Sequence, residues 1–522
     1  MINDRRETFA WPTVPGPWKR ISKSFWLAFL SACLIGTITH LYMFTNLLLN
    51  HDSATQLYTS NDVLSSGRWA LEYLSAFSTC FQLPVVTGLI SLLAIAVSAG
   101  LTVQVLELTH PVHIVLASAL LVTFPSAAAI FSYLFTADAY FLCLMLNALA
   151  VYCTRNYRWG WLFGLPLLTA ACGTYQAFIC YAIGLFLFDC ILRLLKNESL
   201  DRVLHRGAGY ILLCAAALIL YYVVLNLLLY VTGTQLVDYQ GLSGMSLENF
   251  GRFFAKIPSA YQFFEKNILT PGYLTPFFQR SQAAYTLFAG ILALYLVVKQ
   301  NLFRDPPRLL LLAAGTALIP LALNFVSILA LGAEVHELMI YSFVLFFLMI
   351  IKYAELVMAE QVHEKNTRWS AVFFLNLILC LVVIWGNFCT TNTAYLRLQI
   401  RYENTFAAAN RVMARIEALD GYTWETPVAL VGYLPHNAYG KTVDAFSQTE
   451  APIGTEDDLL LSYYSLPYFM ETYIGLHLPK MTADQWQAVY CSDILDEMPC
   501  YPSEGSVILY EGVAVVKFSD PY

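Results

Sequence analysis

The chain has 522 residues, of which 58% are hydrophobic and only 12% are charged, and its formal net charge is −7. Soluble domains carry about 25% charged residues, so a soluble protein of this length is excluded because it could not cover its surface with polar groups. The net charge, without a basic tract outside the short loops, gives no sign of a nucleic-acid partner.

Apolar runs of about 20 residues recur along the chain, and this is the length that crosses the lipid bilayer as a helix. We therefore predict an α-helical polytopic membrane protein, with a basic tail at 1–23 and a membrane domain at 24–388. Two of the expected spans are short. The eleven spans predicted from the apolar runs are 24–48, 83–106, 112–123, 139–154, 160–173, 176–194, 207–230, 283–299, 308–330, 338–352 and 369–388.

Lys and Arg residues are concentrated in every second connection between these spans. Such a bias marks the cytoplasmic side of a membrane protein, and it places the N-terminus inside. The outer segments are then the loops 49–82, 124–138, 231–282 and 331–337, together with the region from 389 onward.

The loop 231–282 is too long to be a simple connector. Its apolar residues recur every three or four positions, with Arg252 and Lys256 among them, which predicts a helix lying at the membrane surface. Two roles remain open: the helix only packs on the bundle, or it shapes a groove for a lipid-linked substrate. The apolar positions are Leu247, Phe250, Phe253, Phe254, Ile257, Tyr261, Phe264 and Ile268.

Residues 389–522 have the pattern of a small extracytoplasmic α/β domain. The run 426–434 predicts a buried strand, and 506–518 predicts a hairpin that turns at Glu511-Gly512. Helices are expected over 482–490 and 457–470. Cys491 and Cys500 lie in this polar region, where a disulfide and two free thiols remain equal alternatives.

Ionisable residues are almost absent from the predicted spans. The main exception is Asp189, which is expected to pair with Arg193 four residues later. Acids lie instead at the outer ends of the spans, at Asp52, Asp138 and Glu334. This placement favours chemistry at the membrane surface over ion conduction through the membrane.

The outer residues offer a base and a phosphate ligand. Asp52 and Asp138 each lie beside a helix end and apolar groups, where a carboxylate is dehydrated enough to act as a general base; the alternative for each is a solvated helix-end acid. Arg68 matches a phosphate with its planar fork of donors, or else it binds ordinary lipid headgroups. Trp69 fits the headgroup layer, and Asp62 is expected to cap the short helix that follows it.

The segment 334–337 holds Glu334, His336 and Glu337, which either supply a ligand for a divalent metal or a second base or form an ordinary polar rim, and Glu334 and His336 are also candidates for binding substrate. No cluster has the spacing of a metal site, so metal dependence stays open. The motifs of zinc peptidases, serine hydrolases and P-loop enzymes do not occur in the sequence.

Several short motifs resemble the serotype-converting O-antigen glucosyltransferase family, which belongs to the multi-spanning C-type glycosyltransferase superfamily. They are "NHDS" with Asp52, "GRW" at 67–69, a "P…Y…AD" pattern ending at Asp138, and "GTYQA" with Tyr175 and Gln176. The likeness covers most of the membrane part. The family usually has two acids close together in the first outer loop, whereas Asp52 and Asp62 here are ten residues apart, so either of them is a candidate.

The resemblance implies transfer of a hexose, with glucose as the expected sugar, from a polyprenyl-phosphate donor to a cell-surface glycan or cell-wall polymer outside the bacterial cytoplasmic membrane. Asp52 or Asp138 would take the acceptor proton, and Arg68, helped by Arg252 or Lys256, would stabilise the departing lipid phosphate. Tyr175 and Gln176 would bind the sugar or the acceptor. A transporter or flippase of lipid-linked sugars is the alternative, and so is a scaffold whose C-terminal domain binds a glycan.

Overall fold

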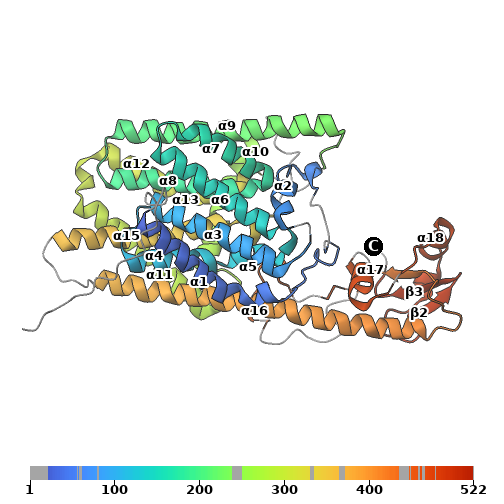
Figure 1. Ribbon diagram of the computed structural model, residues 1–522. Coiled ribbons are helices and arrows are strands. Elements are labelled where there is room, and N and C mark those ends of the chain that lie inside the picture. The colour runs from blue at the N-terminus through green and yellow to red at the C-terminus, as the bar shows by residue number, and fades with distance from the viewer. Residues whose placement is uncertain are drawn as a thin grey trace, which may run out of the picture.

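The computed structural model describes a helical bundle joined to a small C-terminal domain (Figure 1). The residues it describes are 22–55, 57, 62–78, 81–237, 250–329, 334–363, 371–433, 446, 448–456, 459–460, 465–476 and 478–520. The membrane part contains α1 (Lys23–Thr45), α3 (Pro84–Val105), α4 (Pro111–Thr123), α5 (Pro125–Ser132), α6 (Leu134–Asn156), α7 (Gly160–Thr174), α8 (Ile179–Leu195), α9 (Leu200–Thr232), α10 (Phe250–Leu269), α11 (Pro276–Lys299), α12 (Pro306–Ala317), α13 (Ile319–Leu323), α14 (Val326–Leu329), α15 (Val344–His363) and α16 (Ala371–Glu417).

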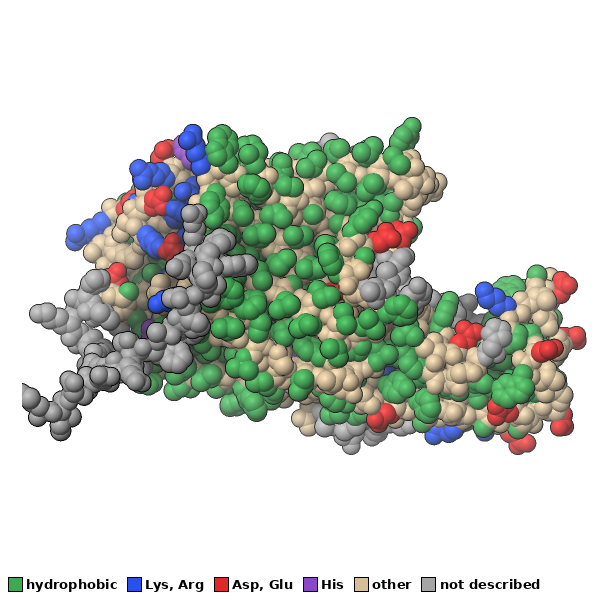
Figure 2. All heavy atoms as spheres, in the orientation of Figure 1, with side chains coloured by type: hydrophobic (Ala, Val, Ile, Leu, Met, Phe, Trp, Pro, Cys, Tyr) green, Lys and Arg blue, Asp and Glu red, His purple; other side chains and the backbone are tan. Residues whose placement is uncertain are grey.

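Ten helical segments in the described residues are long and apolar enough to cross a membrane, and α7 is a shorter apolar helix between them. The predicted polytopic helical membrane protein is thereby confirmed, and α7 accounts for the eleventh expected span. Hydrophobic side chains cover the flank of the bundle, and Lys and Arg side chains gather at the end opposite the C-terminal domain (Figure 2). This distribution agrees with the charge bias in the sequence, while the orientation across the membrane stays a prediction.

We call the end of the bundle where α1 ends and α3 and α6 begin the rim. Between α1 and α3 it carries the short elements η2 (Leu64–Ser66), α2 (Leu71–Ser75) and η3 (Ala76–Ser78). At the rim the predicted outer loop 124–138 is wrong, because α5 and the start of α6 occupy it and only Phe124 and Tyr133 fall outside these helices. Pro125 begins α5 at a position where a helix tolerates proline, so it bends the chain without ending the span.

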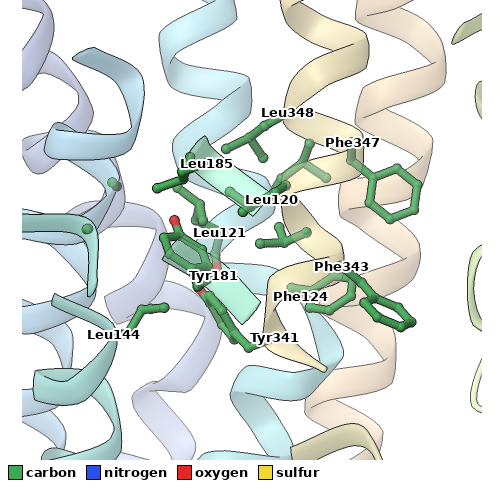
Figure 3. Close-up of a cluster of buried hydrophobic side chains, with 14 of the residues drawn as sticks. Leu120, Leu121, Phe124, Leu144, Tyr181, Leu185, Tyr341, Phe343, Phe347 and Leu348 are labelled. Carbon is green, nitrogen blue, oxygen red and sulfur yellow. The ribbon is translucent and has the colours of Figure 1, made fainter. Parts of the chain in front are cut away.

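The side chains in Figure 3 come mainly from α4, α6, α8 and α15, and they belong to a bundle core that also includes aliphatic and aromatic residues of α1, α3 and α5. Two tyrosine hydroxyls of this core bond across helices. The hydroxyl of Tyr341 donates to the carbonyl of Leu121 at 2.5 Å, and those of Tyr181 and Thr102 are 2.7 Å apart. The interior of a bilayer offers no water to these hydroxyls and carbonyls, so such bonds satisfy them within the protein.

A separate ionic cluster lies at the end of the bundle opposite the rim. Arg193 Nε bonds Asp189 Oδ2 at 2.7 Å, which confirms the predicted pair, and Arg155 Nε bonds Oδ1 at 2.6 Å. The Tyr210 hydroxyl donates to Oδ2 at 2.9 Å. Three helices, α6, α8 and α9, are therefore tied together at one buried carboxylate.

α10 confirms the helix predicted in the loop 231–282. Its buried apolar residues are Ala260, Phe264 and Ile268, and the helix packs on α11, α13 and α14, whereas Phe254 is exposed. The spacing of three or four residues explains why this helix lies along the bundle with one apolar face covered. Residues 238–249 of the predicted loop, including Leu247, lie outside the described residues.

α16 runs for 47 residues, so the helix does not end near the predicted domain boundary at 389. Its buried residues continue with helical spacing through Thr391, Ala394, Leu398, Arg401 and Thr405. The sequence has no Gly or Pro between Gly386 and Gly421 that would end the helix. At a rise of about 1.5 Å per residue the helix is about 70 Å long, and it extends from the bundle into the C-terminal domain.

The C-terminal domain contains a three-stranded sheet in the order β1 (Val428–Val431), β3 (Val513–Lys517), β2 (Val507–Tyr510). β1 is parallel to β3, with Val428 opposite Ala514, and β2 pairs with β3 as the expected hairpin. Glu511 and Gly512 both have positive φ, as the favoured two-residue hairpin turn requires. This confirms the predicted strands.

Alternate residues of β3 pack against opposite layers. Ala514 and Val516 face α16, and Val513 and Val515 face α18 (Ala483–Tyr490) and α19 (Ile494–Glu497). The helix expected over 457–470 is limited in the described residues to α17 (Ser465–Phe469) and the π-helical turn η11 (Met470–Ile474). Cys491 and Cys500 are both exposed free thiols.

Candidate functional site

The chain turns sharply as it leaves α1 at the rim. Asn50 is fully buried, and its Oδ1 accepts hydrogen bonds from the amides of Asp52 at 3.0 Å and Ser53 at 2.8 Å. The Ser53 hydroxyl adds a third bond at 2.7 Å. This side-chain-closed turn fixes the backbone beneath His51 and Asp52 and leaves the Asp52 side chain 41% exposed.

His51 connects Asp52 to neighbouring elements. Its Nε2 lies 3.5 Å from Asp52 Oδ2 and 3.4 Å from the hydroxyl of Tyr133, the residue that precedes α6. The rings of His51 and Tyr133 meet edge to face, with centroids 5.7 Å apart. Asp52 is thus an accessible carboxylate with a proton-accepting ring beside it, which is an arrangement suited to general-base chemistry.

Asp138 lies in a different environment from Asp52. It is fully buried on the second turn of α6, and Oδ1 accepts the amide of Ala139 at 2.8 Å. Oδ2 has no hydrogen-bond partner within the described part of the chain, although the Ser78 side chain lies beside the carboxylate. An enclosed carboxylate cannot reach an acceptor hydroxyl unless the segment around η3 moves.

The structure brings four predicted site residues together around the "GRW" motif: Arg68, Trp69, Tyr175 and Gln176. Arg68 is half-buried, with its Nε donating to Ser66 Oγ at 3.0 Å and its Nη1 to the hydroxyl of Tyr140 at 3.1 Å. The ring of Tyr140 stacks on Tyr175 at a centroid distance of 4.6 Å. These contacts hold the guanidinium in one orientation, as the binding of a phosphate by its planar fork requires.

Gln176 fixes the backbone on the other side of Arg68. Its Nε2 donates to the hydroxyl of Tyr221 at 2.8 Å and to the carbonyl of Gly67 at 3.3 Å, and the Tyr221 hydroxyl donates to the same carbonyl at 3.0 Å. Tyr140 and Tyr221 were not predicted, because a tyrosine within an apolar span has no local pattern that separates it from the core. Only the short distance from Asp138 to Tyr140 in the sequence could have drawn attention to it.

Trp69 lies against α7 at a close approach. A Cβ placed on Gly173 would be 2.4 Å from the Trp69 ring, and the amide of Ala70 donates to the carbonyl of Gly173 at 2.8 Å. Trp69 Nε1 is buried without a hydrogen bond to any described residue. The indole therefore packs between the first loop and α7.

A second group of charges reaches the rim from the C-terminal part of the chain. Glu337 Oε2 accepts the amide of Ile453 at 3.2 Å, and burial raises the pKa of Glu337, with the charges of Glu450 and Glu456 adding to the effect. Burial, followed by the charge of His51, lowers the pKa of His336 to about 4. His336 is therefore neutral near pH 7, and the influence of His51 on it indicates that the two imidazoles lie near one another.

The remaining predicted residues lie further from these contacts or have no described side chain. Asp62 Oδ1 accepts the amide of Leu64 at 3.4 Å, but Val63 occupies the N-cap position of η2 and no side chain caps this helix, so the predicted cap is wrong. Glu334 is exposed, and Lys256 is half-buried on α10. Arg252 also lies on α10, but its side chain is outside the described part of the structure.

The described residues contain no group of three or more His, Cys, Asp or Glu side chains placed to hold a metal ion. The acids at the rim have different neighbours. Asp52 lies beside His51, Glu337 accepts the amide of Ile453, and Asp138 accepts the amide of Ala139 in α6. Metal dependence therefore stays as open as the sequence left it.

Comparison with known proteins adds one finding. A family model described as Glucosyl transferase GtrII matches residues 41–347, which is more than half of the chain and contains Asp52, Arg68, Asp138, Tyr175 and Gln176. The match confirms the resemblance inferred from the motifs, and it ends before α16 begins. No curated protein and no solved structure matches the chain.

Proposed function

The chain belongs to the Glucosyl transferase GtrII family and is a multi-pass membrane glucosyltransferase, and from this premise we propose that it moves glucose from a polyprenyl-phosphate donor to a glycan or cell-wall polymer on the extracytoplasmic face. The observation that carries the proposal is the accessible Asp52 carboxylate at the rim, held beside His51 by a side-chain-closed turn.

Two further features of the rim support it. The half-buried Arg68 is oriented by Ser66 and Tyr140, which suits it to a phosphate that is presented at membrane depth. The flank of the bundle is apolar over a broad surface (Figure 2), so a long isoprenoid tail can lie in the bilayer while its phosphate reaches the rim. Bacterial cytoplasmic-membrane location and an inside N-terminus belong to the same proposal.

In the proposed reaction, Asp52 takes the proton from an acceptor hydroxyl as that oxygen bonds to the anomeric carbon of the sugar. The bond between the anomeric carbon and the phosphate oxygen breaks, and its electron pair leaves with the lipid phosphate. Arg68 stabilises the charge that develops there. Asp138 is assigned the supporting role of holding η3 over the start of α6, because its carboxylate is enclosed.

We expect Asp52→Asn to lower kcat by about 10²–10⁴-fold, the usual contribution of a general base. The measurement is transfer of radiolabelled glucose from a polyprenyl-phosphate donor to purified cell-surface polysaccharide, with the protein reconstituted in lipid. Asp201→Asn is the matched control, since Asp201 is an exposed acid at the start of α9. Asp138→Asn is run alongside, and transfer that survives both substitutions at Asp52 and Asp138 would contradict the assignment and favour the transport alternative.

A further inference from the structure

A segment of the C-terminal part, residues 448–456, docks directly on the rim. The amide of Glu450 donates to the carbonyl of Gly272 at 3.0 Å, and that of Ile453 to Glu337 at 3.2 Å. Gly454 has a φ of +80°, and a Cβ on it would lie 2.2 Å from Ser132 Oγ. Only glycine permits this approach, so the segment is fitted to the end of α5 rather than resting loosely on it.

The docked segment places Glu456 between the first loop and α16. Its Oε1 accepts the amide of Gly454 at 2.9 Å, and its Oε2 lies 3.9 Å from His51 Nδ1 and 3.8 Å from Arg401 Nη2. Arg401 is only 2% exposed. Glu456 is thus held by a backbone amide and faces a buried cation on one side and His51 on the other.

His51 consequently has an acid on each side of its ring. Nε2 faces Asp52 at 3.5 Å, and Nδ1 faces Glu456 at 3.9 Å. The other titratable neighbours in the described structure are Tyr133, 3.4 Å from Nε2, and His336. The His51 side chain is also 48% exposed, so a proton on it can pass to water.

We propose that His51 and Glu456 form a proton relay behind Asp52, with Arg401 as the residue that positions Glu456. This inference rests on the proposed function. After Asp52 has taken the acceptor proton, that proton moves from Asp52 Oδ2 to His51 Nε2, which restores the carboxylate. Glu456 balances the positive charge of the imidazolium until the proton leaves to solvent, so no oxidant or further reactant is needed.

The relay gives the C-terminal part of the chain a role in turnover, although it lies outside the matched family region at 41–347. Glu456 and Arg401 contact neither substrate in this scheme. Each acts through its neighbour, Arg401 on Glu456 and Glu456 on His51, so both are positioning residues. Their effect should therefore appear in kcat and in its pH dependence, with KM for the donor unchanged.

The test is the pH profile of kcat for Glu456→Gln, with Glu456→Asp for recovery and Glu504→Gln as the matched control, since Glu504 is an exposed acid of the same domain. His51 accepts the proton only when Nε2 is free, so protonation of its ring gives the profile an acidic limb. Removing the charge of Glu456 destabilises the imidazolium, and we expect this limb to move to lower pH by about 0.5 to 1 unit. We also expect kcat on the plateau to fall about threefold to tenfold, within the range of a single proton-transfer group.

A second variant tests the relay independently, in case Glu456→Gln does not fold. His51→Gln removes the relay from a half-exposed position, and we expect the limb that depends on His51 to disappear. A limb that stays in place in Glu456→Gln, or persists in His51→Gln, overturns the relay. If Asp52→Asn abolishes transfer and the limb of Glu456→Gln stays where it is in the unmodified protein, the relay fails and the proposed function stands. If Asp52→Asn retains transfer, the proposed function itself fails.

Discussion

Asp189 shows how a single acid can stabilise the end of the bundle opposite the rim. Its two carboxylate oxygens are bonded by Arg155 and Arg193, and the Tyr210 hydroxyl adds a third bond. Arg193 also bonds Glu198, and Arg155 bonds Glu107. A buried pair of this kind is expensive to break, because the partner that remains is left charged and dehydrated.

We expect Asp189→Asn to lower the free energy of unfolding by about 3–5 kcal/mol, the range for removing one partner of a buried ion pair. Asn keeps the shape but removes the carboxylate that the two guanidinium groups share, so Arg193 is left with Glu198 and Arg155 with Glu107 as acidic partner. The measurement is thermal unfolding in detergent, followed by loss of helical circular dichroism or by aggregation. Asp201→Asn, at an exposed acid, should unfold like the unmodified protein; equal unfolding temperatures for both variants would show that the cluster carries no stability.

At the scale of elements, the contact between the first loop and α7 determines how well Arg68 is held. The loop approaches α7 closely at Gly173. A Cβ on this residue would lie 2.4 Å from the Trp69 ring, so the indole would have to shift. The same contact is fixed by the bond from Ala70 to Gly173. Displacing the indole would therefore also displace the adjacent guanidinium.

We expect Gly173→Ala to raise KM for the polyprenyl-phosphate donor about threefold to tenfold, a loss of roughly 0.7–1.4 kcal/mol of binding. The helix itself should not suffer, because alanine is the better helix former. Gly290→Ala is the control, since a Cβ there meets nothing within 4 Å. Initial rates over a range of donor concentrations separate KM from kcat. An unchanged KM would show that the position of Trp69 does not affect donor binding.

The sequence predicted those elements whose signal is local. The apolar runs, the amphipathic α10 and the hairpin at Glu511-Gly512 all appear as expected. The predicted loop 124–138 failed because α5 begins at Pro125, and a proline at the first turn continues a span after a bend. The predicted boundary at 389 failed because polar residues on one side of a helix resemble the start of a soluble domain.

The candidate site was predictable only in part, for the same reason. Arg68, Trp69, Tyr175 and Gln176 belong to short motifs, and the structure brings them together. Glu456 and Arg401 lie far along the chain from Asp52, and tertiary packing alone brings them to the rim. No periodicity or spacing marks a residue whose importance comes from such a contact.

On the scale of the whole molecule, α16 is the element that joins the bundle to the C-terminal domain (Figure 1). Its first half packs on α1, α4, α11 and α15, and its last turns contribute Ala408, Val412 and Met413 to the core shared with the sheet. Arg397, between these halves, donates to the carbonyls of Phe446 and Thr449, both at 2.8 Å. A straight α16 therefore fixes the position of the sheet and of residues 448–456 relative to the rim.

We expect Asn404→Pro to lower transfer more than tenfold, because it would bend α16 between the bundle and the domain. Asn404 is exposed and lies one turn beyond Arg401, so the change removes no buried contact of its own. Proline in a helix interior removes a backbone hydrogen bond, clashes with the preceding turn and costs about 3 kcal/mol. The bend would draw Glu456 away from His51 while the spans stay packed, and so kcat should fall without loss of the folded bundle in detergent. Asn404→Ala keeps the helix straight and should retain full transfer; equal activity in the two variants would mean that the C-terminal domain needs no fixed position for turnover.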